Sequence, residues 1–159
     1  MKITIWSDFA CPFCYIGETQ LENVLRDKGM IREDGSLEGV ELCFRAYELD
    51  PAAPKVPKAT MAEHFASSHD LTEAEALSQM DRITRMASRV GLEYNLAGVQ
   101  VCSTFDAHRL MKYAIAEGDP AMALRLQFAL FEANFKQCLC LADREVLEDI
   151  AARAGLDRG

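Results

Sequence analysis

Two cysteines, Cys11 and Cys14, have the types and spacing best suited to chemistry in this sequence. They follow a short apolar run and precede a helical pattern, so we expect them in the first turn of a helix. Their Cα atoms would then lie about 5–6 Å apart, which allows a disulfide. Free N–H groups and the helix dipole there stabilise a thiolate, the species that attacks disulfides. We predict that Cys11, at the helix cap, attacks and that Cys14, one turn further in, resolves, while Pro12 and Phe13 tune the reduction potential of the pair.

A zinc site is the main alternative for these thiols, because two cysteine pairs often share a metal ion. Cys138 and Cys140 could supply the second pair. Zinc-binding pairs usually occupy short turns with glycine, so redox chemistry without a metal is favoured. Cys138 and Cys140 could instead form a second redox pair that exchanges disulfides with Cys11 and Cys14, or simply pack beneath the helices.

The elements that must position the cysteines begin with a β-α-β unit. Residues 3–6 read as a buried strand, the pattern after Pro12 is helical until Gly29, and residues 40–47 alternate as a second strand. The two strands should be parallel. Prolines at 51, 54 and 57 form an extended connector, and everything beyond has helical period. We therefore predict an α/β fold in two parts, residues 1–57 and 58–159.

Capping signals mark the helices of the second part. Thr72 with Glu75 reads as a capping box, and Asp119 before Pro120 reads as a helix start. The helix after Asp119 is apolar almost all round, so we expect it at the centre of the packing. A last helix should follow Asp143. Cys43 and Cys102 have no close partner in the sequence and read as packing residues.

Charge and hydropathy exclude several classes of protein. The 159 residues carry a net charge of −8 without a long basic run, which disfavours nucleic-acid binding. No segment approaches the roughly 20 apolar residues that cross a bilayer, and the N-terminus lacks the apolar core of a signal peptide. We expect a cytoplasmic protein that does not bind membranes, a setting in which paired cysteines tend to be catalytic or metal-binding.

Several motifs together resemble those of the DsbA-like thioredoxin-fold family, and the match is closest to its cytoplasmic FrnE subgroup. They are Ser7-Asp8, the Cys-Pro-Phe-Cys motif at 11–14, Arg-Ala-Tyr-Glu-Leu at 45–49 and Thr-Phe-Asp-Ala-His-Arg-Leu at 104–110. The resemblance implies a thioredoxin-like fold with a large helical insertion after the second strand. It also implies thiol–disulfide oxidoreductase activity on protein or small-molecule substrates, carried by Cys11 and Cys14, with glutathione as a candidate redox partner and no bound cofactor.

Two further residues gain interest from this resemblance. The segment of His108 would lie near the active site, so His108 could contact the cysteine motif; otherwise it makes a polar contact at an interface. Asp8 precedes Cys11 by three residues and could form the turn there, accept a proton, or raise the pKa of the thiol by charge repulsion. The motif has no histidine between its cysteines, so we expect a less oxidising pair than that of DsbA, whose potential is about −120 mV.

Other functions within and beyond the superfamily stay open. Kappa-class glutathione transferases and chromene-carboxylate isomerases look similar at the N-terminus but carry serine where this chain has Cys11. A glutathione-dependent isomerase or transferase is therefore an alternative that the two cysteines disfavour. A non-enzymatic binding module, either zinc-bound or redox-inactive, is the other.

The sequence departs from the family at its C-terminal side. Family members continue with a cis-proline loop, two strands and a closing helix, and none of the five prolines here matches that loop. We expect a fragment with a truncated sheet, which could be inactive because the loop helps to bind substrate. An exposed sheet edge would also make a homodimer plausible.

Overall fold

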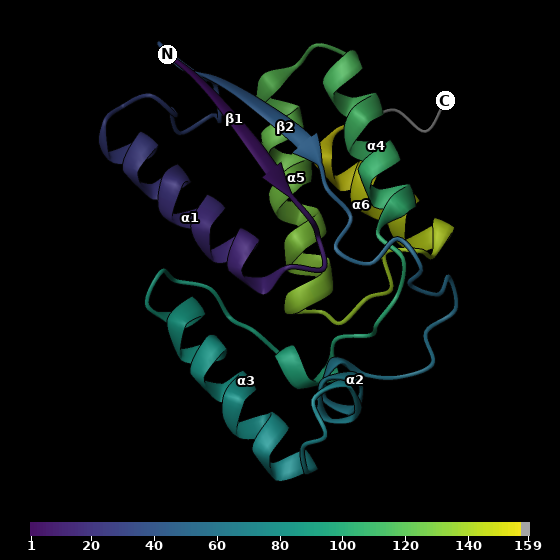
Figure 1. Cartoon of the computed structure of the whole chain (residues 1–159). Coiled ribbons are helices and arrows are strands. Elements are labelled where there is room, and N and C mark those ends of the chain that lie inside the picture. The colour runs from purple at the N-terminus through teal and green to yellow at the C-terminus, as the bar shows by residue number, and fades with distance from the viewer. Residues whose placement is uncertain (157–159) are drawn as a thin grey trace.

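The computed structural model describes residues 1–156, which form two strands and six α-helices joined by loops. Figure 1 shows their arrangement. The elements are β1 (Lys2–Ser7), α1 (Pro12–Asp27), β2 (Glu41–Ala46), α2 (Met61–Ser68), α3 (Glu73–Ser88), α4 (Phe105–Ala116), α5 (Pro120–Phe135) and α6 (Arg144–Ala154), with a short 3₁₀ turn at Leu96–Gly98. The mixed α/β class predicted from the sequence is confirmed.

The β-α-β unit at the start of the chain forms as predicted. Strands β1 and β2 are parallel, and their register runs from Lys2 opposite Glu41 to Ser7 opposite Ala46. They are the only strands of a two-stranded sheet within residues 1–156. Such a sheet is too small to be stable by itself, so its stability depends on the helices that pack against it.

Local capping signals account for most of the helix boundaries. The Thr72–Glu75 capping box is present at the start of α3, and the Asp119 side chain accepts hydrogen bonds from two backbone N–H groups of α5. Helix α6 ends at Gly155, whose φ of 98° is a conformation that glycine adopts readily. A second capping box, Thr60 with Glu63, starts α2.

Helix α5 lies at the centre of the packing, as its apolar sequence predicts. The largest core cluster includes Leu126, Leu130 and Phe131 of α5 together with Phe9 and Tyr15 from the first part of the chain. A smaller cluster combines residues of α1, its following loop and α5, namely Leu25, Ile31, Val40 and Leu124. Figure 1 shows α5 behind the sheet, between α1 and α4. The division at residues 57 and 58 stays a prediction, since α5 packs with residues from both sides of it.

The N-terminal end of α1 lies at the boundary between the sheet and helices α2 and α3 (Figure 1). Its first turn therefore faces loops from both parts of the chain. Within residues 1–156, no helix is both long and apolar enough to cross a membrane.

Candidate active site

Cys11 is the N-cap of α1, the position predicted from the sequence. Its Sγ accepts a hydrogen bond from the backbone N–H of Cys14 at 3.3 Å. Pro12 occupies the first helical turn, where its lack of an N–H costs no hydrogen bond. Both thiols are free and half-buried, whereas the Phe13 side chain between them is exposed. The arrangement places one sulfur where a helix N-terminus favours negative charge.

The two thiols have opposite pKa shifts. The hydrogen bond from the Cys14 thiol, helped by the backbone N–H groups of Cys14 and Phe13, lowers the pKa of Cys11 to about 6 against burial and the charge of Asp8. The pKa of Cys14 is raised, first because its thiol donates to Cys11 and second because it is buried. At neutral pH Cys11 is therefore mainly the thiolate and Cys14 the thiol. This is the division between attacking and resolving sulfur that disulfide exchange requires.

Asp8 is a buried carboxylate that holds the turn before Cys11. It is 2% exposed and accepts hydrogen bonds from the backbone N–H of Leu49 at 2.7 Å and the hydroxyl of Thr104 at 2.7 Å. Its Oδ1 also lies 3.2 Å from Nε2 of His108. Burial favours the neutral carboxyl, but these bonds outweigh it and lower the pKa of Asp8. Asp8 thus joins the end of β1 to the segment after β2 and to α4.

His108 contacts the turn before the cysteine motif, and its hydrogen-bond partner is Asp8. Its side chain is 10% exposed, and its ring packs against Phe9 with the centroids 4.9 Å apart. The structure therefore places His108 next to the motif, with its side chain bound to Asp8.

Two long-range hydrogen bonds fix the backbone of the motif. Asn134 of α5 donates from Nδ2 to the carbonyl of Phe9 at 2.8 Å. The Tyr94 hydroxyl, from the loop after α3, donates to the carbonyl of Pro12 at 2.7 Å. Tyr15 then stacks on both Tyr94 and Phe131, which ties the first turn of α1 into the core. The helical part of the chain thus positions the two sulfurs.

Glu18 is a second buried carboxyl group, one helical turn beyond Cys14. It is 6% exposed; Oε2 accepts from Nε2 of Gln127 at 2.9 Å, while Oε1 has no hydrogen-bond partner. Burial is the main cause that raises the pKa of Glu18 to about 7, and the nearby Cys14 adds to the shift. Glu18 is therefore a carboxyl group that titrates near neutral pH behind the cysteine pair.

These supporting residues differ in how far the local sequence indicates them. Glu18 could have been found, because it follows Cys14 by four residues and must share its face of the helix. Tyr94 and Asn134 come from distant loops and helices, and nothing in their local sequence indicates a contact with the motif.

The other cysteines do not gather around Cys11 and Cys14 as the zinc alternative would require. Cys138 Sγ contacts the carbonyl of Asn95 at 3.4 Å, whereas Cys140 Sγ contacts the carbonyl of Lys55 at 3.8 Å. Within residues 1–156, no three or more His, Cys, Asp or Glu side chains are arranged to hold a metal ion. The Cys140 thiol instead lies near Cys102 and raises its pKa, although the sequence suggested that Cys102 was only a packing residue.

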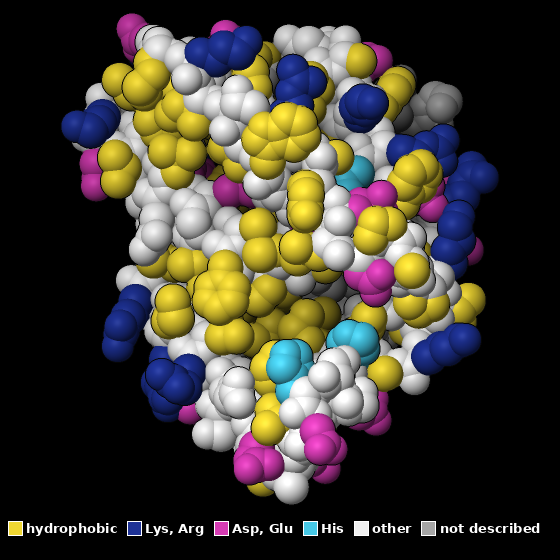
Figure 2. Space-filling view, in the orientation of Figure 1, with side chains coloured by type: hydrophobic (Ala, Val, Ile, Leu, Met, Phe, Trp, Pro, Cys, Tyr) yellow, Lys and Arg dark blue, Asp and Glu magenta, His cyan; other side chains and the backbone are white. Residues whose placement is uncertain are grey.

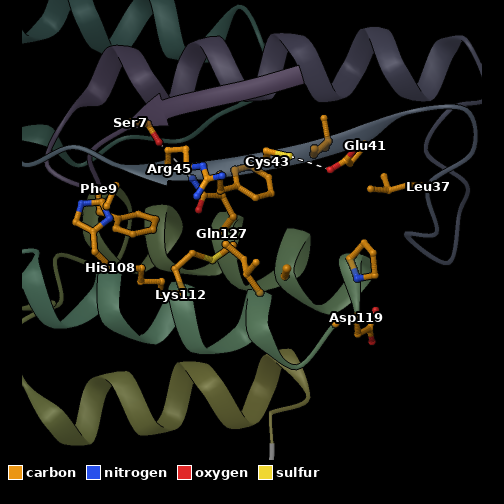
Figure 3. A pocket seen from close by; sticks show the side chains of 18 residues that line it. Ser7, Phe9, Leu37, Glu41, Cys43, Arg45, His108, Lys112, Asp119 and Gln127 are labelled. Atoms are coloured by element: carbon orange, nitrogen blue, oxygen red, sulfur yellow. Dashed lines mark hydrogen bonds between the residues drawn. The ribbon is translucent and has the colours of Figure 1, made fainter. Parts of the chain in front are cut away.

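A cavity of about 330 Å³ runs along β2 on the side of α4 and α5 (Figure 3). His108 and Phe9 line one end of it, and Asp119 lies near the other. Neither Cys11 nor Cys14 lines this cavity. Figure 2 shows apolar side chains across the middle of a different surface region, over the start of α1, with Lys and Arg mostly toward the margins.

The chain and its fold match a known family. The DSBA-like thioredoxin domain matches residues 2–159, and the chain belongs to this family. A crystal structure of a probable DsbA oxidoreductase from Streptomyces coelicolor is similar, with a TM-score of 0.83 and 32% identity over 99% of this chain. The chain spans 64% of that protein's length. No curated protein matches the sequence. The thioredoxin-like fold with a helical insertion that the motifs predict is thereby confirmed.

Proposed function

We propose that this protein is a thiol–disulfide oxidoreductase that works through the Cys11–Cys14 pair. One observation carries the proposal: Cys11 caps α1 with a pKa of about 6, while the adjacent Cys14 stays protonated. Membership of the DSBA-like family and the likeness to a probable DsbA oxidoreductase support it. The motifs at 45–49 and 104–110 further favour the FrnE subgroup, with its cytoplasmic setting.

The geometry supports a two-step exchange. The Cys11 thiolate attacks one sulfur of a substrate disulfide, forms a mixed disulfide and releases the other sulfur as a thiolate. Cys14 then loses its proton and attacks Cys11 Sγ, which releases the second substrate thiolate and leaves the Cys11–Cys14 disulfide. The substrate is reduced by two electrons, and the protein is oxidised by two. The reverse sequence oxidises a dithiol substrate.

The substrates we propose are thiol- or disulfide-containing proteins and small molecules. The apolar surface over the start of α1 favours unfolded polypeptide among them (Figure 2). Glutathione is the candidate small-molecule redox partner. Because no histidine lies between the cysteines, we expect a potential below the value of about −120 mV of DsbA. Equilibration with glutathione buffers measures it, and a value at or above that of DsbA would contradict the expectation.

Single cysteine variants test the proposal directly. Cys11→Ser should lower the rate of insulin reduction by at least about 100-fold, because serine cannot form the mixed disulfide. Cys14→Ser should trap the mixed disulfide, visible as an added mass on the protein. Cys43→Ser, on β2, is the matched control and should keep wild-type activity. Equal activity in Cys11→Ser and the wild type would refute the assignment.

A further inference from the structure

A second pair of thiols meets at a distance from the Cys11–Cys14 motif. Cys102 lies in the segment before α4 and is 7% exposed, while Cys140 lies in the loop between α5 and α6 and is partly exposed. The Cys140 thiol lies close enough to the Cys102 thiol to raise its pKa. Both are free thiols in the structure. Two helices separate them in the sequence, so only the fold brings them together.

Backbone hydrogen bonds hold the segments of both cysteines against the same connector. The residues on either side of Cys102 bond to it, with Val101 N–H to the carbonyl of Ala59 at 3.1 Å and Ser103 N–H to that of Pro54 at 2.9 Å. Cys140 Sγ contacts the carbonyl of Lys55. The backbone N–H groups of Ala142 and Leu141 lie near enough to the Cys102 thiol to lower its pKa. These bonds fix the relative position of the two thiols from both sides.

Cys138 is oriented differently, although it is only two residues from Cys140. Its backbone has a φ of 55°, which few residues other than glycine adopt, and its Sγ bonds to Asn95. A β-carbon on Gly98 would lie 3.2 Å from that sulfur, so the glycine leaves room for it. Cys138 therefore faces the 3₁₀ turn, away from the partner of Cys140.

We propose that Cys102 and Cys140 are a second redox pair, which a small-molecule disulfide such as glutathione disulfide oxidises to a disulfide. The pair is independent of the activity proposed for Cys11 and Cys14. The bond would connect the segment before α4 to the loop between α5 and α6. Since Thr104, at the end of the segment before α4, and His108, on α4, both hold Asp8, the bond would also stiffen the support of the cysteine motif.

The order of the two steps follows from exposure. The partly exposed Cys140 attacks glutathione disulfide as a thiolate, forms a mixed disulfide and releases one glutathione thiolate. Cys102 then gives up its proton and attacks Cys140 Sγ, which releases the second glutathione. Two protein thiols are oxidised, and one glutathione disulfide is reduced to two glutathione molecules. Burial, with the hydrogen bond to Cys140, raises the pKa of Cys102 to about 12, so Cys102 reacts second.

Peptide mapping after oxidation tests this pair. The Cys11→Ser/Cys14→Ser double variant is treated with glutathione disulfide, alkylated and digested with trypsin. We expect the loss of two free thiols and a disulfide between peptides 90–109 and 137–144, which contain Cys102 and Cys140. Adding Cys138→Ser as the matched control should preserve the link, and adding Cys140→Ser should abolish it. Oxidation should raise Tm by roughly 5–10 °C, and dithiothreitol should reverse the rise.

Three results would overturn the proposal. One is a disulfide to Cys102 that survives Cys140→Ser and disappears with Cys138→Ser, because the partner of Cys102 would then be Cys138. Another is a disulfide confined to peptide 137–144, which joins Cys138 to Cys140. The third is glutathione attached to Cys140 with no link to Cys102.

Discussion

The pKa of Cys11 results from a balance between opposing influences on its thiolate. Hydrogen bonds from Cys14 and from the start of α1 stabilise the negative charge, while burial and, less strongly, the carboxylate of Asp8 oppose it. Asp8 therefore holds the turn in place, but its negative charge raises the pKa of Cys11. Of the roles that the sequence suggested for Asp8, the structure supports turn formation and a raised thiol pKa.

Replacing Asp8 separates these two roles. In Asp8→Asn the opposing charge is gone, so the pKa of Cys11 should fall below its present value of about 6. The pH dependence of alkylation by iodoacetamide measures it. Stability should drop by about 1–3 kcal/mol, because one amide cannot accept every bond that the carboxylate accepts. Asp106→Asn, a carboxylate paired with Arg109 on α4, is the control and should leave the alkylation profile unchanged.

Glu18 should make the protein less stable as pH rises through neutrality. Its pKa is about 7 in the folded state against an ordinary value near 4.5, so the folded state holds the proton more tightly. Its contribution is complete below about pH 4.5 and is lost by pH 8, a change of up to about 3 kcal/mol. Urea unfolding at several pH values measures it.

Glu18→Gln should flatten this part of the profile, because glutamine cannot ionise. The exposed Glu33→Gln is the control and should retain the wild-type slope. A slope that persists in Glu18→Gln would show that other groups cause it.

At the level of helices and strands, the boundaries that depend on neighbouring residues were predictable. Bonds made within a few residues mark the starts of three helices: α3 at Thr72 with Glu75, α5 at Asp119 before Pro120, and α6 at Asp143. The end of α6 is marked in the same way by Gly155. The position of Cys11 as a cap was predictable for the same reason. Contacts across the fold were not, as with Tyr94 on Pro12 and Cys140 on Cys102, because no local pattern indicates which loops will meet.

Because α5 lies at the centre of the packing, truncating its apolar side chains should strongly lower the free energy of unfolding. Leu130→Ala removes a side chain that is fully buried and should lower the free energy of unfolding by about 3 kcal/mol. Leu77→Ala on α3, where the side chain is 40% exposed, makes the same chemical change and should cost less than about 1 kcal/mol. Equal losses in chemical denaturation would mean that α5 is not the main packing element.

For the whole molecule, the main question is whether the sheet region and the helical region unfold together. The motif depends on both, since Asn134 and Tyr94 from the helical part bind the backbone of Phe9 and Pro12. A site assembled in this way loses its geometry if either part opens. The proposed boundary near residue 57 therefore separates two sequence patterns, while hydrogen bonds and core contacts cross it.

Helix α5 contributes side chains to both apolar clusters, and this has a kinetic consequence. Its middle amide protons can reach solvent only when both clusters separate, so they should exchange with deuterium more slowly than those of α3. Their exchange rate would then report the unfolding of the entire protein. A protease that cleaves only the unfolded chain would gain access to both apolar clusters in the same event.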